Sequence, residues 1–185
     1  YKSSDHSDYE NAHFILDLNY ECPKKYENKF DIIYSGGTLD NIFNPAQGII
    51  NIYKMLKPGG RALITEASAY HAGVYTAMSP EWFASFFAVN ECVDVQVYCY
   101  CVRSSKNQWV FDTDLFKWNP HFTRRNDFDY VKSSNAVGGQ MYTMIVAEKS
   151  LRPSNEIVMP IQSHYMQSKD NNWVKTFDGY NESKR

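Results

Sequence analysis

The stretch that decides the fold runs from Phe30 to Ala67 and reads FDIIYSGGTLDNIFNPAQGIINIYKMLKPGGRALITEA. Its two ends, Phe30–Tyr34 and Arg61–Thr65, are short runs of apolar and β-branched residues, which are typical of buried strands. Between them, apolar residues recur at three- and four-residue spacing and predict one face of a helix: Ala46, Ile49, Ile50, Tyr53 and Leu56. Two buried strands joined through a helix form a right-handed crossover in a parallel sheet. The stretch therefore predicts one α/β unit.

The predicted helix has a start signal and a stop signal. Asn44-Pro45 starts it, because Asn offers a side-chain acceptor at the cap and Pro presets φ in the first turn. Lys57-Pro58-Gly59-Gly60 ends it, because Pro cannot continue a helix and Gly accepts a left-handed turn.

One more helix and two more strands are predicted downstream. Ser79-Pro80-Glu81 starts the helix, whose aromatic stripe we interpret as core packing rather than a ligand site: Trp82, Phe83, Phe86 and Phe87. Val93–Val102 alternates and predicts a strand with one face made of Val93, Val95, Val97, Cys99 and Cys101. Tyr142–Glu148 predicts the last strand.

Length and composition set the class. The 185 residues fit one domain that buries roughly 70% of its unfolded surface. A net charge of −2 gives no electrostatic reason to expect a nucleic acid, and no apolar run has the length of a membrane span. Four cysteines without CxxC spacing indicate buried small side chains rather than a metal site. We therefore expect a cytoplasmic protein without metal.

Several segments together resemble one family. FDIIYSGG, LDNIFN and LKPGGRALITE look like the second half of a class I S-adenosylmethionine-dependent methyltransferase, and the similarity extends to DLNYECP, MSPEWFASFF and MPIQSHY. The resemblance implies an α/β fold with a Rossmann-like sheet, mostly parallel, whose last two strands form an antiparallel hairpin at the edge. It also implies S-adenosylmethionine as the cofactor.

The family's Gly-rich first motif is not found in the sequence. No GxGxG occurs, and the glycine pairs are isolated and have turn explanations. By resemblance, the chain enters the fold at the end of the second strand, so we expect the N-terminal strand and Gly-rich loop to be absent. The expected organisation is a partial domain over 1–150, with an insertion or lid at 104–140, and an extended arm over 151–185.

The resemblance assigns candidate cofactor-binding residues. Asp5 follows the expected second strand and would accept hydrogen bonds from the ribose hydroxyls; alternatively it is a solvated loop or cap residue. Asp17 would face the adenine amino group while Leu18 packs on the ring, although Asp17 could equally be a turn residue. Ser35 and Gly36 follow the central strand, at the carboxyl edge where open α/β sheets bind ligands.

The candidate catalytic residues follow the strand Arg61–Thr65. His71 is the best candidate for a general base that removes a proton from an acceptor hydroxyl, and Glu66 is the second. The alternative for His71 is an exposed loop histidine. Tyr75 would border the acceptor. Many relatives carry a His where this chain has Asn41, whose amide cannot titrate.

The long connection 104–140 and the C-terminal arm give further expectations. Arg124 and Arg125 lie among aromatic residues and could bind a sugar or nucleotide-sugar acceptor; a lid or an oligomer contact is the alternative. The arm carries Trp173, Phe177 and Tyr180, which could anchor it to a second copy.

Two functions remain open at this point. The first is an O-methyltransferase that acts on a hydroxyl of a saccharide or other small metabolite. The second is a catalytically inactive methyltransferase-like domain that serves as a structural or interaction subunit. The absent Gly-rich loop and the replaced His support this second function. The sequence alone leaves open whether this chain is an enzyme by itself.

Overall fold

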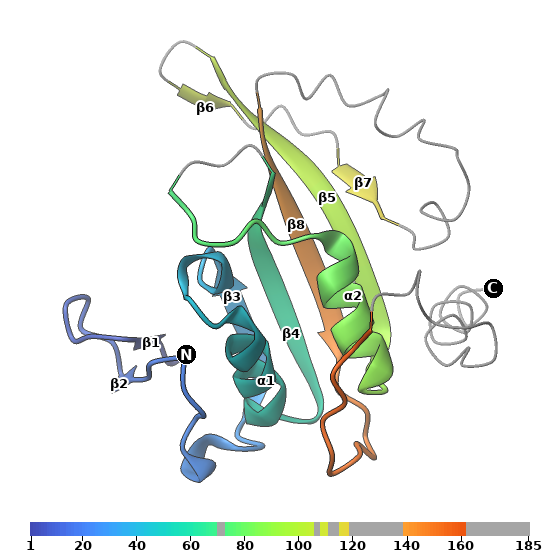
Figure 1. Ribbon diagram of the computed structural model, residues 1–185. Coiled ribbons are helices and arrows are strands. Elements are labelled where there is room, and N and C mark those ends of the chain that lie inside the picture. Colours follow the sequence, from blue (N-terminus) through green and yellow to red (C-terminus); the bar gives the residue numbers. More distant parts are fainter. Residues whose placement is uncertain (70–72, 106–107, 111–114, 119–138, 162–185) are drawn as a thin grey trace.

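The computed structural model describes residues 1–69, 73–105, 108–110, 115–118 and 139–161. A six-stranded sheet has the order β3-β4-β8-β5-β6, with β7 paired to β5, and helices α1 and α2 lie side by side on one of its faces (Figure 1). The sheet and its helices are β3 (Phe30–Gly36), α1 (Pro45–Met55), β4 (Leu56–Ala69), α2 (Pro80–Val89), β5 (Val93–Ser105), β6 (Gln108–Val110), β7 (Leu115–Lys117) and β8 (Gly139–Glu148). The remaining elements are a separate parallel pair, β1 (Ser4–Asp5) and β2 (Phe14–Ile15), and the 3-10 turns η1 (Lys24–Tyr26) and η2 (Leu39–Asn41).

The predicted crossover unit is confirmed. Strands β3 and β4 pair in parallel, with Tyr34 opposite Leu63, and α1 connects them. The Asn44 side chain accepts a hydrogen bond from the Gln47 amide at 3.3 Å, and Pro45 is the first helical residue. The predicted inner face of α1 is buried at Ile49, Ile50 and Tyr53, whereas Ala46 lies exposed at the start of the helix.

The Lys57–Gly60 turn requires both of its glycines. Gly59 has φ +77°, a conformation that residues with a Cβ rarely adopt. A Cβ on Gly60 would lie 2.9 Å from the Lys57 carbonyl oxygen and 3.0 Å from that of Phe30. Backbone atoms cannot move aside as a side chain can. This turn lies inside β4, where the pairing with β3 shifts from Phe30 opposite Leu56 to Ile32 opposite Arg61.

A buried lysine closes the carboxyl end of α1. Lys149, directly after β8, donates from Nζ to the carbonyl oxygens of Tyr53 at 3.0 Å and Leu56 at 2.8 Å. These carbonyls have no partner within the helix, so the ammonium group completes their hydrogen bonding. Burial lowers the pKa of this ammonium. The end of the last strand is thereby tied to the first helix.

The expectation of a mostly parallel sheet is wrong, because the sheet is mixed. Strands β3, β4 and β5 run in one direction, but β8 lies between β4 and β5 and runs antiparallel to both. The antiparallel pairing of the last two predicted strands is confirmed, but β8 is an internal strand and not an edge strand. In the described part of the connection 104–140, β6 and β7 both pair with β5.

The predicted inner face of β5 begins two residues later than expected. Val95, Val97, Cys99 and Cys101 are buried, but Val93 is 47% exposed. Asp94 has φ +50°, and the pairing with β8 shifts between Val93 and Gln96. This irregularity turns the first residue of the strand away from the core.

One hydrophobic core lies between the sheet and the two helices. The Ser79 hydroxyl caps α2 by accepting from the Trp82 amide at 3.2 Å. Phe83, Phe86 and Phe87 are buried in this core, as predicted, while Trp82 packs against it from its margin. None of the helices in the described ranges combines the length and the apolar character needed to cross a bilayer.

The two ends of the described chain attach to the helices. Asn51, fully buried on α1, donates to the carbonyl oxygens of Leu18 and Tyr20 and accepts from the Cys22 amide at 3.0 Å. On the other side, Asn90 exchanges two hydrogen bonds with the Val158 backbone, at 2.9 and 3.0 Å. The part of the predicted arm up to Ile161 therefore runs along the helices; residues 162–185 lie outside the described residues.

Candidate functional site at the carboxyl ends of β3 and β4

Three of the candidate residues come together where β3 and β4 end. Ser35 and Gly36 lie opposite Ile64 and Thr65 of β4, and Glu66 is the next residue of that strand. The Ser35 hydroxyl donates to Glu66 Oε1 at 3.0 Å. Pairing of the two parallel strands thus places these residues at the same edge of the sheet.

A second carboxylate, Asp40, joins three chain segments at this edge. Its Oδ2 accepts from the Ala67 amide at 2.7 Å, and its Oδ1 accepts from the Asn41 side chain at 2.8 Å. Its carbonyl oxygen accepts from the amides of Tyr75 and Thr76. The loop after β3, the end of β4 and the segment before α2 are therefore held by one residue, which is 2% exposed.

Glu66 holds the backbone of Asp40 in place. It is 0% exposed, and its Oε2 accepts from the Asp40 backbone amide at 3.2 Å. Burial and, to a smaller extent, the negative charge of Asp40 together raise the pKa of Glu66 to about 7, against the hydrogen bonds from backbone amides and Ser35 that lower it. Among the described residues, neither carboxylate takes part in a salt bridge.

The burial of Glu66 bears on its assignment as second base. With both oxygens accepting hydrogen bonds and no exposed surface, Glu66 does not reach an acceptor in this conformation. The arrangement supports a positioning role, in which Glu66 holds the Asp40 loop. Asn41 likewise braces the loop by donating to the Gly37 carbonyl at 2.8 Å.

The backbone beside this cluster is open. A Cβ placed on Gly37 would meet no atom within 4 Å, and Gly37 has φ +66°. Gly36 is exposed, and the Tyr34 hydroxyl lies only 2.5 Å from the position that a Cβ on Gly36 would take. A ligand can therefore approach the main chain at Gly37, whereas the Tyr34 side chain covers the Cβ side of Gly36.

Asp5, Asp17 and Leu18 lie on a different part of the molecule. Asp5 ends β1 and Asp17 follows β2, so parallel pairing places them at the same edge of that small sheet. Asp5 accepts from the Ser7 amide at 2.9 Å, which lowers the pKa of its carboxyl group, and its side chain is 33% exposed. Asp17 is exposed and accepts from the Asn19 amide at 2.9 Å, which lowers its pKa too. Leu18 packs against the small cluster of Leu16, Cys22 and Met55.

The hydrogen bond to Asn19 confirms the turn interpretation of Asp17. The predicted contact of Asp17 with the adenine amino group of the cofactor stays a prediction. Of the described residues, no strand pair links β1 and β2 to β3. The two sheets are connected instead by Asn51 of α1, by hydrogen bonds between Asn19 and Asn44, and by the packing of Phe14 on Phe30.

An aromatic pair borders the site. Tyr75, predicted as an acceptor contact, is 72% exposed, and its ring meets that of Phe43 edge to face at 5.9 Å between centroids. The Tyr75 amide donates to the Asp40 carbonyl at 2.9 Å, and this hydrogen bond ties the aromatic pair to the Asp40 loop. His71, Arg124 and Arg125 lie outside the described residues.

Sequence reasoning missed three residues that shape the site. Asp40 was visible only as part of a loop motif, although an acid in the loop after a glycine-containing strand end is a recognisable signal. Phe43 gives no signal, because a single aromatic residue before a helix is commonly core. Asn51 occupies a polar position on the inner face of a predicted helix, and a buried amide in such a place indicates a bridging role.

In the described ranges, no group of His, Cys, Asp or Glu residues is arranged to hold a metal ion. What the site offers is a pair of buried carboxylates, an open glycine backbone and an exposed aromatic rim. Such an edge suits an organic ligand with polar groups.

Comparisons with known proteins agree with the geometry. A family model described as "Methyltransferase domain" matches residues 2–126, which is more than half of the chain. A solved S-adenosylmethionine-dependent methyltransferase from Archaeoglobus fulgidus is similar with a TM-score of 0.51 and 12% identity, over 79% of this chain and 74% of that one. At this identity the likeness concerns the fold alone. No curated protein matches the chain.

Two further structures are similar at lower scores. A methyltransferase from Thermotoga maritima has a TM-score of 0.48 and 9% identity, over 75% of this chain and 65% of that one. Phosphoethanolamine N-methyltransferase 2 from Haemonchus contortus, in complex with S-adenosyl-L-methionine, has a TM-score of 0.43 and 17% identity, over 74% of this chain and 37% of that one. The chain thus spans less than two thirds of the length of either protein.

Proposed function

Because the chain belongs to the methyltransferase-domain family, we propose that it is an S-adenosylmethionine-dependent O-methyltransferase that acts on a hydroxyl group of a saccharide or small metabolite. The observation that carries the proposal is the linked pair Glu66 and Asp40, which holds three loops at the carboxyl edge of β3 and β4. In open α/β sheets this edge is where ligands bind.

S-adenosylmethionine is the cofactor, and when bound it supplies a methyl group on a positively charged sulfur. The residues present fit it: Gly37 leaves its backbone accessible beside Gly36, and Asp5 has a partly exposed carboxylate for hydroxyl groups. Asp17 and Leu18 are assigned to the adenine. The Ser35 hydroxyl, which donates to Glu66, keeps the strand end in place.

The acceptor side is assigned to the aromatic rim and to residues beyond it. Tyr75, with Phe43, presents ring faces and edges on which the apolar face of a sugar can pack. Arg124 and Arg125 are assigned to polar groups of the acceptor, and His71 to removal of its proton. Methyl transfer then depends chiefly on alignment, which Asp40 and Glu66 support by fixing the loops.

Calorimetric titration of the 185-residue chain with S-adenosylmethionine and S-adenosylhomocysteine tests the proposal. We expect both to bind, and Asp5→Asn to weaken binding at least about fivefold through loss of hydrogen bonds to a charged group. Asp31→Asn is the matched control, because Asp31 is exposed and pairs only with Lys57 in the described part of the chain. If neither compound binds, the inactive-subunit alternative takes the place of this proposal.

A second experiment measures methyl transfer to hydroxyl acceptors. Once cofactor binding is established, His71→Ala should abolish methyl release to a hydroxyl acceptor while leaving cofactor affinity unchanged. Unchanged turnover in that variant would remove His71 from the mechanism.

A further inference from the structure

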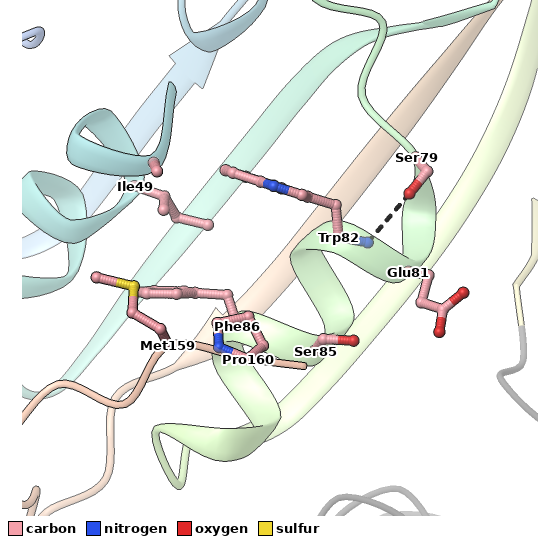
Figure 2. A pocket seen from close by; sticks show the side chains of 9 residues that line it. Ile49, Ser79, Glu81, Trp82, Ser85, Phe86, Met159 and Pro160 are labelled. Atoms are coloured by element: carbon pink, nitrogen blue, oxygen red, sulfur yellow. Dashed lines mark hydrogen bonds between the residues drawn. The ribbon is translucent and has the colours of Figure 1, made fainter. Parts of the chain in front are cut away.

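A groove lies between α1 and α2, and the C-terminal arm already occupies one end of it (Figure 2). Helix α1 forms one wall and α2 forms the other, while the arm, which follows β8, supplies two lining residues. The groove contains a cavity of about 350 Å³, whose apolar lining residues are Ala46, Ile49, Trp82, Phe86, Met159 and Pro160. Beyond the two arm residues, the described part of the chain leaves this groove open.

The arm enters the groove from the end of α2. Asn90, the C-cap of α2, exchanges hydrogen bonds of 2.9 and 3.0 Å with the Val158 backbone. In Figure 2, the next residue of the arm, Met159, lies beside Phe86, and Trp82 lies one turn closer to the start of the helix. The described arm thus runs from the end of α2 toward its start, and the residues that follow continue toward the part of the groove beside Trp82.

Apolar surface continues from the groove to the aromatic rim of the carboxyl-edge site. Met159, at the near end, is 59% exposed, and Ala46, in the first turn of α1, is exposed as well. Phe43, which precedes Ala46 in the same part of the chain, is 84% exposed and contacts the ring of Tyr75. Exposed apolar residues therefore mark a path from the described end of the arm to this rim.

The arm has the length to follow this path. Ile161 is the last described residue and is 64% exposed, and residues 162–185 come after it. The distance along α1 and its cap from Ile49 to Phe43 is about 9 Å, at about 1.5 Å per residue. The residues from Ile161 to Tyr165 span about 16 Å when extended, at about 3.3 Å per residue. Tyr165 is thus within reach of the rim.

The sequence after Ile161 also suits this path. It continues as Gln162-Ser163-His164-Tyr165, so three polar residues come before the first aromatic residue beyond the described arm. Polar side chains keep contact with water while their backbone crosses the mouth of the groove. A tyrosine ring packs edge to face against other rings and keeps its hydroxyl group in water.

We propose that the continuing arm of the same chain covers this groove, with residues 162–164 crossing it and Tyr165 packing on the rim formed by Phe43 and Tyr75. The same chain is favoured over a second copy because Pro160 already lines the groove, and a tethered segment docks without the entropic cost of bringing two molecules together. The rim then consists of three rings, one of them supplied by the arm. This docking does not depend on the proposed methyl transfer.

Engineered disulfides test where the arm lies. Ala46→Cys is combined in turn with cysteine at each of the positions 162, 163 and 164, and the matched controls combine the same three changes with Lys24→Cys, at an exposed position in η1 outside the groove. The cysteines of the original chain are buried. Under mild oxidation of the full chain, at least one combination with Ala46→Cys should form a disulfide within one chain about tenfold faster than its control, because docking raises the local concentration of the two thiols.

The products are separated on a non-reducing gel, and the linked peptides are identified by mass spectrometry. Rates equal to those of the Lys24→Cys controls would overturn the proposal. Disulfides that join two chains would overturn it too, because they would identify the arm of a second copy as the occupant of the groove.

Two matched tyrosine variants test the contact at the rim. Tyr165→Ser in the full chain should shift the NMR signals of the Phe43 ring and of the Ala46 and Met159 methyl groups. Tyr180→Ser, the same change farther along the arm, should leave these signals in place. Signals that do not respond to Tyr165→Ser, or that respond equally to both variants, would overturn the proposal. Titration with S-adenosylmethionine reports separately on the methyltransferase proposal.

Discussion

Two buried carboxyl groups, Glu66 and Asp40, meet at the end of β4 with backbone amides and a serine hydroxyl as partners. Hydrogen bonds from neutral donors offset only part of the cost of removing a carboxylate from water. Glu66 therefore keeps its proton up to about pH 7, while in the unfolded chain it would lose the proton near 4.5.

This difference gives a pH dependence with a definite sign. Between about pH 4.5 and 7 the folded chain binds a proton at Glu66 that the unfolded chain has released, so stability falls as pH rises through this window. We expect the free energy of unfolding to fall by about 2–3 kcal/mol there. Urea denaturation at intervals of half a pH unit measures it.

The variant Glu66→Gln isolates the contribution of Glu66 to the pH dependence of stability. Gln resembles the protonated carboxyl group, with its oxygen accepting from Asp40 and its amide donating to the Ser35 oxygen, so the variant should lose most of the pH slope. Glu10→Gln, at an exposed residue, is the control and should keep it. A variant slope equal to that of the original chain would assign the pH dependence to other groups.

Residue types alone indicated part of this site. Ser35, Gly36 and Glu66 were found because strand ends in an α/β unit converge, which is a property of topology. The burial of Glu66 was not predictable, since it depends on Asp40 and on the loop that crosses above it. The hydrogen bonds of Asp17 to Asn19 are local, and the turn alternative was therefore visible in the sequence.

At the scale of elements, local signals were the most reliable guide. Asn44-Pro45 and Ser79-Pro80 each mark the start of a helix to the residue, because a cap satisfies amides within its own first turn. The start of β5 at Val93 was predicted correctly, but Val93 was wrongly assigned to the inner face, because the pairing with β8, a strand more than forty residues away, is irregular between Val93 and Gln96.

Helix α2 offers a matched pair of serine variants. Ser79→Ala removes an acceptor for the Trp82 amide and should lower the free energy of unfolding by about 0.5–2 kcal/mol. Ser85→Ala removes a hydroxyl that has no partner in the described chain, so it should be neutral or slightly stabilising. Thermal unfolding followed by circular dichroism compares the two. Equal losses in both variants would contradict the capping argument.

At the scale of the whole molecule, the strand order could not be predicted from sequence patterns. The apolar alternation of Tyr142–Glu148 predicts a strand but does not identify its neighbours. The position of β8 between β4 and β5 depends on distant contacts, among them Lys149 at the end of α1 and Arg61 with Glu148 at 2.7 Å. The family resemblance correctly predicted that β8 pairs antiparallel with β5. It was wrongly taken to place this hairpin at the edge of the sheet, whereas β8 is an internal strand.

Three of the hydrogen bonds that attach the N-terminal segment to α1 depend on a single side chain, Asn51. Asn51→Leu keeps the size of the residue but leaves the carbonyls of Leu18 and Tyr20 and the Cys22 amide without their partner. We expect a loss of about 2–4 kcal/mol and faster hydrogen exchange over residues 14–22, with β4 and β8 protected as before. The same variant should weaken S-adenosylmethionine binding if Asp17 and Leu18 hold the adenine.

Lys54→Leu is the control for this variant, because Lys54 is on the same helix and pairs with the exposed Glu21. An exposed ion pair contributes little, so this change should stay within about 1 kcal/mol. Faster exchange throughout the sheet in Asn51→Leu would show a general loss of stability instead of a detached segment.

The internal position of β8 also determines the order in which a growing polypeptide can fold. Residues 30–69 can form β3, α1 and β4 as soon as they are synthesised, because their contacts are local. The edges of β4 and β5 stay unpaired until residues 139–148 follow, and unpaired strand edges are sites of self-association. During synthesis, the edge of β4 therefore stays open while residues 70–138 are made, and the edge of β5 stays open with it over residues 106–138. A chaperone would protect the chain in this second interval.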